Sequence, residues 1–149
     1  MTIYLDCDGT WINLYGVENW LDYLLAEDVY PYANAKPLVN LSLLARTIHE
    51  LQRKGVKVGI ISWLSKGGSE TYNAAVDITK RKWFKRHIPS VTFDEVHIVK
   101  YGTPKSSCAT QANAILFDDE EKNRAEWKGK AFDEKDLIKN LRAILSALD

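Results

Sequence analysis

Residues 3–10 read Ile3-Tyr4-Leu5-Asp6-Cys7-Asp8-Gly9-Thr10, and the organisation of the 149-residue chain can be worked out from this stretch. Its apolar start is typical of a buried strand, and two carboxylates follow that strand directly. In an open α/β sheet, ligands bind at the carboxyl ends of the strands. Alternation along an extended chain places Asp6 and Asp8 on one side and Cys7 on the other. Two like charges this close favour a cation between them, and paired carboxylates suit Mg²⁺.

Three further polar sites follow apolar runs or turns later in the chain. They are Ser62 after Val58-Gly59-Ile60-Ile61, Lys105 within Tyr101-Gly102-Thr103-Pro104-Lys105-Ser106, and Asp118-Asp119 after Ala114-Ile115-Leu116-Phe117. Together with Asp6-x-Asp8-Gly9-Thr10, their order resembles the four motifs of the haloacid dehalogenase (HAD) superfamily of phosphohydrolases. The resemblance spans residues 3–119 and implies a Mg²⁺-dependent phosphatase that acts on phosphomonoesters.

The rest of the pattern predicts an α/β fold. Strands are expected at 2–6, 56–61, 93–99, 114–117 and 130–132, and they alternate with helical segments, which indicates a parallel sheet with helices on both faces. We expect Pro37, Ser69 and Asp133 to begin three of the helices. The resemblance implies a single domain over 1–149, doubly wound and Rossmann-like, with strand order 5-4-1-2-3.

Residues 11–36 show no clean period and contain six aromatic residues. Long irregular segments in compact domains are usually lids or binding loops. The resembled family carries a flap or cap at this point, so we expect 11–36 to be a flap or minimal cap.

The resemblance also implies a role for each motif residue. Asp6 is the nucleophile that forms an aspartyl-phosphate, and Asp8 is the general acid and base. Mg²⁺ ligands are expected from Asp6, Asp8, Asp118 and Asp119, and which member of the last pair binds directly is left open. Substrate contacts are expected from Gly9, Thr10, Ser62, Trp63 and Lys105. Lys105 is preferred to Lys100 as the active-site cation because Thr103-Pro104 is typical of a helix start, where anions bind.

The basic run Lys80-Arg81-Lys82-Trp83-Phe84-Lys85-Arg86-His87 suggests nucleic acid, but cations are favoured at a helix C-terminus in any case. We therefore expect the run to form the last turns of a helix that also buries Tyr72, Ala75, Val76, Thr79 and Trp83. Nucleic acid is a possible partner but is not favoured. The formal net charge is zero, no stretch is long and apolar enough to span a membrane, and Cys7 and Cys108 are expected to be reduced thiols of a cytoplasmic protein.

Three alternatives stay open at this stage. One is a nucleotidase or polynucleotide end phosphatase that uses the aromatic flap for a base. Another is a receiver-like module, although no Asp follows Val96-His97-Ile98-Val99, where a receiver accepts phosphate. The third is a phosphate-binding relative without activity. The substrate, small molecule or macromolecule, and the oligomeric state are not determined by the sequence.

Overall fold

The computed structural model describes all residues 1–149 as an α/β fold around a five-stranded parallel sheet. The strands are β1 (Thr2–Leu5), β4 (Lys57–Trp63), β5 (Glu95–Val99), β6 (Ile115–Phe117) and β7 (Ala131–Phe132), in the order β5-β4-β1-β6-β7. Counted along the chain within this sheet and read from the β7 edge, the order is 5-4-1-2-3, as predicted. Leu5 lies beside Ile60 on β4 and beside Phe117 on β6, so the segments that leave these three strands emerge side by side.

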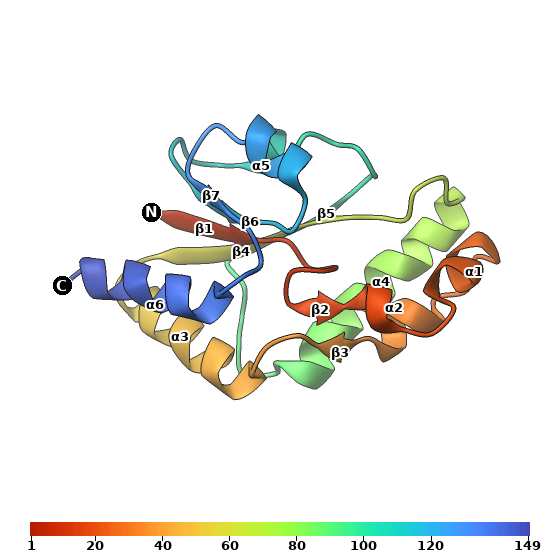
Figure 1. Cartoon of the computed structure of the whole chain (residues 1–149), viewed down its shortest axis with the longest axis horizontal. Helices are drawn as coiled ribbons and strands as arrows, with labels where there is room; N and C mark the ends of the chain where they lie inside the picture. Colours follow the sequence, from red (N-terminus) through yellow and green to blue (C-terminus); the bar gives the residue numbers. More distant parts are fainter.

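Helices cover both faces of the sheet. On one face, α3 (Leu41–Arg53), α4 (Glu70–His87) and α6 (Leu137–Ala147) pack on Ile3 and Leu5 of β1 (Figure 1). On the other, the 3₁₀ turn η2 (Lys105–Cys108) and α5 (Glu121–Glu126) lie above Tyr4. Cys7 continues the alternation of Ile3 and Leu5 and is buried in the same core. Asp6 and Asp8, in contrast, both line the cleft at the strand ends, which agrees with the predicted alternation.

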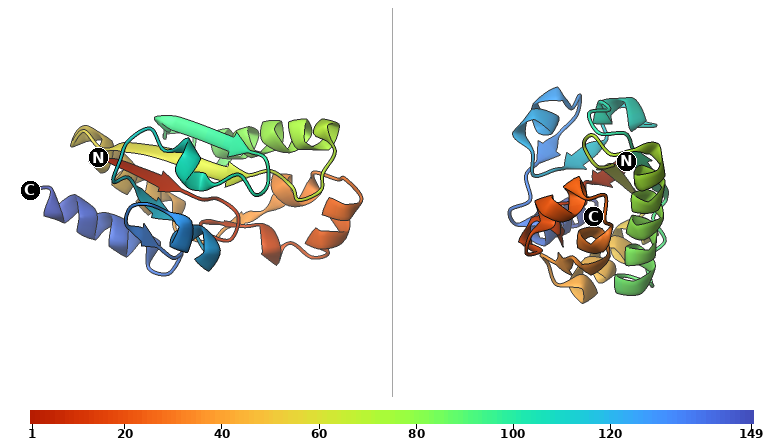
Figure 2. Two further views of the ribbon diagram at one scale, coloured as in Figure 1. Left: turned by 90° about the horizontal axis from the view of Figure 1, so that it is seen from above. Right: turned by 90° about the vertical axis from the view of Figure 1, so that its right-hand side faces the viewer.

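The segment after β1 forms a small subassembly at the carboxyl ends of the strands. It is framed by β2 (Ile12–Asn13), which pairs antiparallel with β3 (Lys36–Pro37), and it holds η1 (Leu14–Gly16), α1 (Trp20–Leu25) and α2 (Tyr30–Asn34). Figure 2 shows it beyond the ends of the strands and beside α4. Hydrogen bonds anchor its second half, because the Trp83 indole N–H donates to Ala35 O at 2.8 Å and the Tyr72 hydroxyl donates to Asp28 O at 2.9 Å.

Of the three predicted helix starts, the structure confirms Ser69 but not Pro37 or Asp133. Ser69 caps α4 by accepting the Tyr72 N–H at 3.1 Å, as expected. Pro37 does not begin a helix but lies in β3, and α3 starts at Leu41 after Asn40, whose side chain accepts the Leu43 N–H at 3.0 Å. Pro37 suits a strand at the edge of a two-stranded pair because it needs no ladder donor there.

Asp133 is also not a helix cap. Its carboxylate accepts the Lys135 N–H at 2.9 Å in a local turn, and α6 begins at Leu137. Asp stabilises such turns as readily as it caps helices, so composition alone does not distinguish the two. No helix of the chain is both long enough and apolar enough to cross a membrane.

Candidate active site

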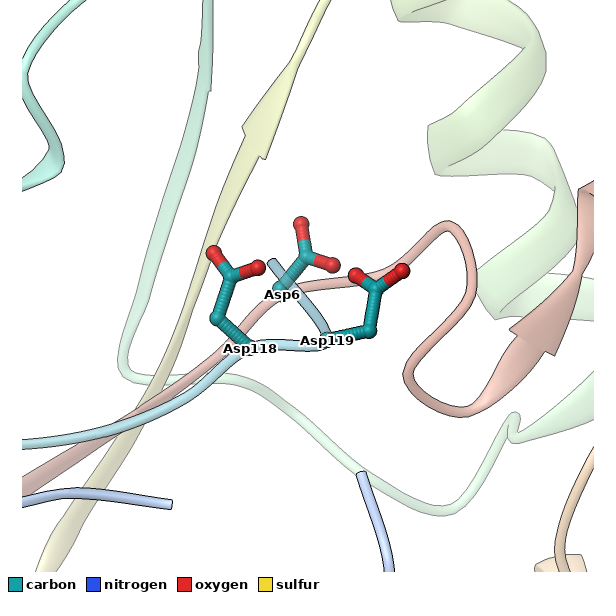
Figure 3. A group of neighbouring side chains, drawn as sticks. All are labelled: Asp6, Asp118 and Asp119. Atoms are coloured by element: carbon teal, nitrogen blue, oxygen red, sulfur yellow. The ribbon is translucent and has the colours of Figure 1, made fainter. Parts of the chain in front are cut away.

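Three aspartates meet where β1 and β6 end. Asp6 follows β1, and Asp118 and Asp119 follow β6, its neighbour in the sheet. One carboxylate oxygen of each lies within 4.8 Å of the others, and Figure 3 shows the three carboxylates on the same side of the backbone (Figure 3). Parallel pairing of β1 and β6 produces this cluster, because it aligns strand ends that are 112 positions apart in a chain of 149.

Lys105 ties two of these carboxylates together. Its Nζ lies 2.7 Å from Asp6 Oδ1 and 2.7 Å from Asp118 Oδ2, and the residue is 5% exposed. Burial opposes the charged ammonium, but the carboxylates of Asp6 and Asp118 outweigh it and raise the pKa of Lys105. The rival residue, Lys100, is exposed and does not line the cleft at this site.

One lysine does not neutralise three carboxylates. Burial, together with the negative charge of Asp6, raises the pKa of Asp119 to about 8, and the same two causes raise the pKa of Asp118 despite Lys105. A group of hard oxygen donors that holds excess negative charge fits a divalent cation such as Mg²⁺. The cluster can therefore hold a metal ion, with Asp6, Asp118 and Asp119 as the side-chain ligands.

Gly9 and Thr10 contact the aspartate cluster and hold its carboxylates in position. Gly9 has φ +84°, and a Cβ on it would lie 2.3 Å from Asp119 Oδ2, so both backbone conformation and space require glycine. The Thr10 hydroxyl donates to Asp6 Oδ2 at 2.8 Å and accepts the Asp119 N–H at 3.2 Å. Thr10 is buried, and neither residue lines the cleft, although both were expected to contact substrate.

A second lysine, Lys80, enters the site from the middle of α4. Its Nζ donates to Asp8 Oδ2 at 2.9 Å, to Ser62 Oγ at 2.7 Å and to Trp63 O at 2.7 Å. These three acceptors match the three N–H groups of an ammonium. From the sequence, this lysine is expected only as part of a basic helix end, but Lys80 is 4% exposed and belongs to the site.

The position of Lys80 along the helix gives a usable sequence signal. Val76 and Trp83 are both buried on α4, and Lys80 lies between them at helical spacing. The pattern also predicts a buried Ala75 on this helix, but the structure leaves Ala75 exposed and buries Lys80. A lysine in the middle of an apolar helix face needs a buried hydrogen-bond acceptor. In the structure, the Asp8 carboxylate is one such acceptor.

Opposing effects therefore act on the pKa of Asp8. Burial raises its pKa, the Lys80 ammonium and its hydrogen bond lower it, the negative charge of Asp6 raises it again, and the net shift is upward. A carboxyl group with a raised pKa holds a proton more readily than an ordinary aspartate, which suits a general acid and base.

A cleft of about 300 Å³ opens above these groups. The predicted site residues that line it are Asp6, Asp8, Trp63, Lys105, Asp118 and Asp119. Ser62 lies behind them at 1% exposure and reaches the site through its hydrogen bond with Lys80. The other walls of the cleft come from the β2–β3 segment and from the loops after β4 and β5, which include Tyr15, Leu21, Tyr32 and Tyr101.

Comparison with known proteins supports the fold alone. No protein-family model matches the sequence, and no curated protein matches it either. Among solved structures, the chain is similar to the D,D-heptose 1,7-bisphosphate phosphatase from Burkholderia thailandensis, with a TM-score of 0.57 and 14% identity. That match covers 97% of this chain and 98% of the phosphatase. The α/β fold with a central parallel sheet that the motifs predicted is therefore present.

Proposed function

We propose that this protein is a Mg²⁺-dependent phosphomonoester hydrolase that acts through an aspartyl-phosphate on Asp6. The observation that carries the proposal is the Lys105 ammonium, 2.7 Å from both Asp6 and Asp118, in a cluster that can bind a metal. This arrangement fixes the Asp6 carboxylate, through Lys105 on Oδ1 and Thr10 on Oδ2, and puts a cation beside it that can balance phosphoryl charge. The motif order and the likeness to a phosphatase fold agree with it.

In the first half-reaction, a carboxylate oxygen of Asp6 forms a bond to phosphorus, and the bond from phosphorus to the ester oxygen breaks. Asp8 donates its proton to the departing alkoxide. In the second, Asp8 takes a proton from water as the water oxygen bonds to phosphorus, and the bond to Asp6 breaks. Inorganic phosphate is released and both aspartates return to their starting states. The raised pKa of Asp8 suits both transfers.

Asp6, Asp118 and Asp119 would hold Mg²⁺, with the Asp8 backbone carbonyl as a further ligand that the resemblance implies, and the ion would supply positive charge for the phosphoryl oxygens. Lys105 keeps Asp6 and Asp118 in place. Ser62 accepts a hydrogen bond from Lys80 and does not line the cleft, so its role is to position that ammonium. Lys80 in turn orients Asp8, the acid–base residue.

Turnover of p-nitrophenyl phosphate by the purified chain, with Mg²⁺ and then with a chelator, tests the proposal. We expect Mg²⁺-dependent release of nitrophenolate and a loss of at least about 10²-fold in rate for Asp6→Asn, since removing a nucleophile usually costs far more. The control is Asp77→Asn, which removes an equally charged side chain on the outside of α4, where Asp77 pairs with Arg81.

No turnover of any phosphate ester, with phosphate or a stable label still bound, would overturn the proposal in favour of a phosphate-binding or receiver-like module. An Asp6→Asn variant that keeps more than about a hundredth of the activity would remove the covalent step.

A further inference from the structure

The outer part of the cleft is apolar, although it is open to solvent. Four of the large apolar side chains that the fold leaves exposed line this one cleft: Tyr15 at 46%, Leu21 at 51%, Leu25 at 75% and Tyr101 at 42%. Single exposed apolar residues are ordinary, but a group of them around one opening marks a binding surface.

One side of the opening is an aromatic platform formed by Trp63 and Tyr101, whose ring centroids are 4.7 Å apart. The Trp63 indole N–H donates to Thr103 O at 2.8 Å, which fixes the ring. Lys105 Nζ lies 5.4 Å from the centre of that ring and 2.7 Å from Asp6 Oδ1. A group attached to a phosphoryl bound at Asp6 therefore has an aromatic face within reach.

Another part of the lining is an apolar wall on α1, made of Leu21, Leu24 and Leu25. Leu24 and Leu25 lie three and four residues after Leu21, so both are its neighbours on the helix surface. No residue of α1 is buried, and only Leu24 packs on the neighbouring apolar cluster. Leu21 and Leu25 belong to none of the apolar clusters of the fold, and both line the cleft.

The charges around the cleft match a single phosphate. Its acidic lining residues are Asp6, Asp8, Asp118, Asp119 and Glu120, while its cations are Lys66 and Lys105. Lys105 is engaged with Asp6 and Asp118, and Lys66 is exposed beside the Tyr101 ring at 5.7 Å. A second phosphate on the substrate would meet acids and one solvated lysine, which is a poor anion site.

We propose that the substrate is a small molecule with one phosphate and a flat aromatic ring, and that this ring lies between the aromatic platform and the apolar wall. The inference rests on the proposed phosphatase function, because it assigns the leaving group of that reaction. A cleft of about 300 Å³ is the size of a small-ligand pocket. Aryl phosphates and nucleoside monophosphates belong to this class.

Binding of phosphonates, which are not hydrolysed, tests the ring site apart from catalysis. With Mg²⁺ present, calorimetry should show benzylphosphonate binding at least about tenfold more tightly than methylphosphonate, because the benzyl ring removes apolar surface from water. Equal affinities would overturn the ring site and leave the phosphatase proposal standing. Failure of both phosphonates and of inorganic phosphate to bind would overturn the phosphatase proposal itself.

Two exposed positions make suitable variants, since neither supports the core. Leu21→Ser and Tyr101→Ala should each weaken benzylphosphonate about three- to tenfold and leave methylphosphonate unchanged. The matched control is Ile78→Ser, because Ile78 is 55% exposed on α4 and does not line the cleft. Equal losses for both phosphonates, or losses in the control, would contradict the assignment.

Turnover identifies the class of leaving group. Phenyl phosphate or thymidine 5′-monophosphate should exceed ribose 5-phosphate and fructose 1,6-bisphosphate in kcat/KM by at least about tenfold. A phosphotyrosine peptide that exceeds free phosphotyrosine by the same factor would place a polypeptide in the cleft and overturn the small-molecule assignment. Preference for the sugar phosphates would overturn the aromatic one.

Discussion

Lys80 Nζ lies 2.9 Å from Asp8 Oδ2, although the two residues are 72 positions apart in the chain. The contact joins the middle of α4 to the segment after β1 and is buried on the lysine side. It gives the site a second ammonium, so that Lys105 holds Asp6 and Lys80 holds Asp8. The Tyr32 ring of α2 lies over the same ammonium, with its centroid 5.2 Å from Nζ, so the β2–β3 segment also contacts this pair.

Lys80→Met should lower kcat by about 10²-fold, since loss of one preorganised donor typically costs this much or more. KM should change far less, because Lys80 does not line the cleft. Lys82→Met, an exposed neighbour on α4, is the control and should keep full activity. Near-normal kcat in folded Lys80→Met would show that the ammonium only fills space.

Asp8→Asn should reduce the rate most for poor leaving groups. An alkyl alkoxide needs the proton from Asp8, and p-nitrophenolate hardly does, so the deficit on an alkyl phosphate should be at least about tenfold larger in the first step. The second step should slow for both esters, and label should accumulate on Asp6 from the activated one. Rapid-quench experiments that count acid-stable label on the protein measure both effects. Equal deficits without trapped label would limit Asp8 to a structural or metal-binding role.

Metal affinity should rise with pH toward about 8, because Asp119 must lose its proton before it can bind a cation. For one proton released, the gain is about tenfold from pH 6 to pH 7. Calorimetric titration with Mg²⁺ across this range measures it, and Asp119→Asn is the variant in which the slope should flatten. A wild-type affinity that does not vary with pH contradicts the raised pKa.

The same group affects the stability of the metal-free protein in the opposite direction. Its pKa is about 8 in the folded state and about 4 in the unfolded chain, so the folded state binds more protons between these values. Without metal, the contribution of Asp119 to the free energy of unfolding should therefore be fully present below about pH 4 and should be lost as the pH rises to about 8. Mg²⁺ should restore the stability. Denaturant titrations at several pH values, each with and without Mg²⁺, follow both changes.

Within residues 11–36, we expect α1 to exchange its amide hydrogens fastest. No residue of α1 is buried, whereas Trp11, Tyr32 and Ala35 near the two ends of the segment are. Protection of α1 should increase with Mg²⁺ and a bound phosphonate, since local opening competes with closure over the ligand. Hydrogen exchange read by mass spectrometry tests this, and α6 serves as the internal reference. Equal exchange with and without ligand would make the segment a fixed wall.

The sheet and most of the acidic site could be predicted from the sequence. Each relevant signal is local, since an apolar run followed by Asp marks a strand end, and a parallel sheet brings strand ends together. This was enough to place Asp6, Asp118 and Asp119 at one edge and to prefer Lys105 to Lys100. Helix starts were less predictable, because Pro37 and Asp133 are as compatible with a strand edge or a turn as with a cap.

The tertiary structure alone decided the surroundings of that edge. Whether a lysine on a mixed helix is solvated or buried depends on a partner that distant chain segments supply, so Lys80 met Asp8 only in the folded molecule. Gly9 is needed because Asp119 fills the space where its Cβ would be, and that contact crosses 110 positions. The apolar residues of α1 resemble core residues in the sequence, but no residue of this six-residue helix is buried, and Leu21 and Leu25 line the cleft. Local patterns determine which elements form and where polar groups emerge, and long-range packing determines what those groups face.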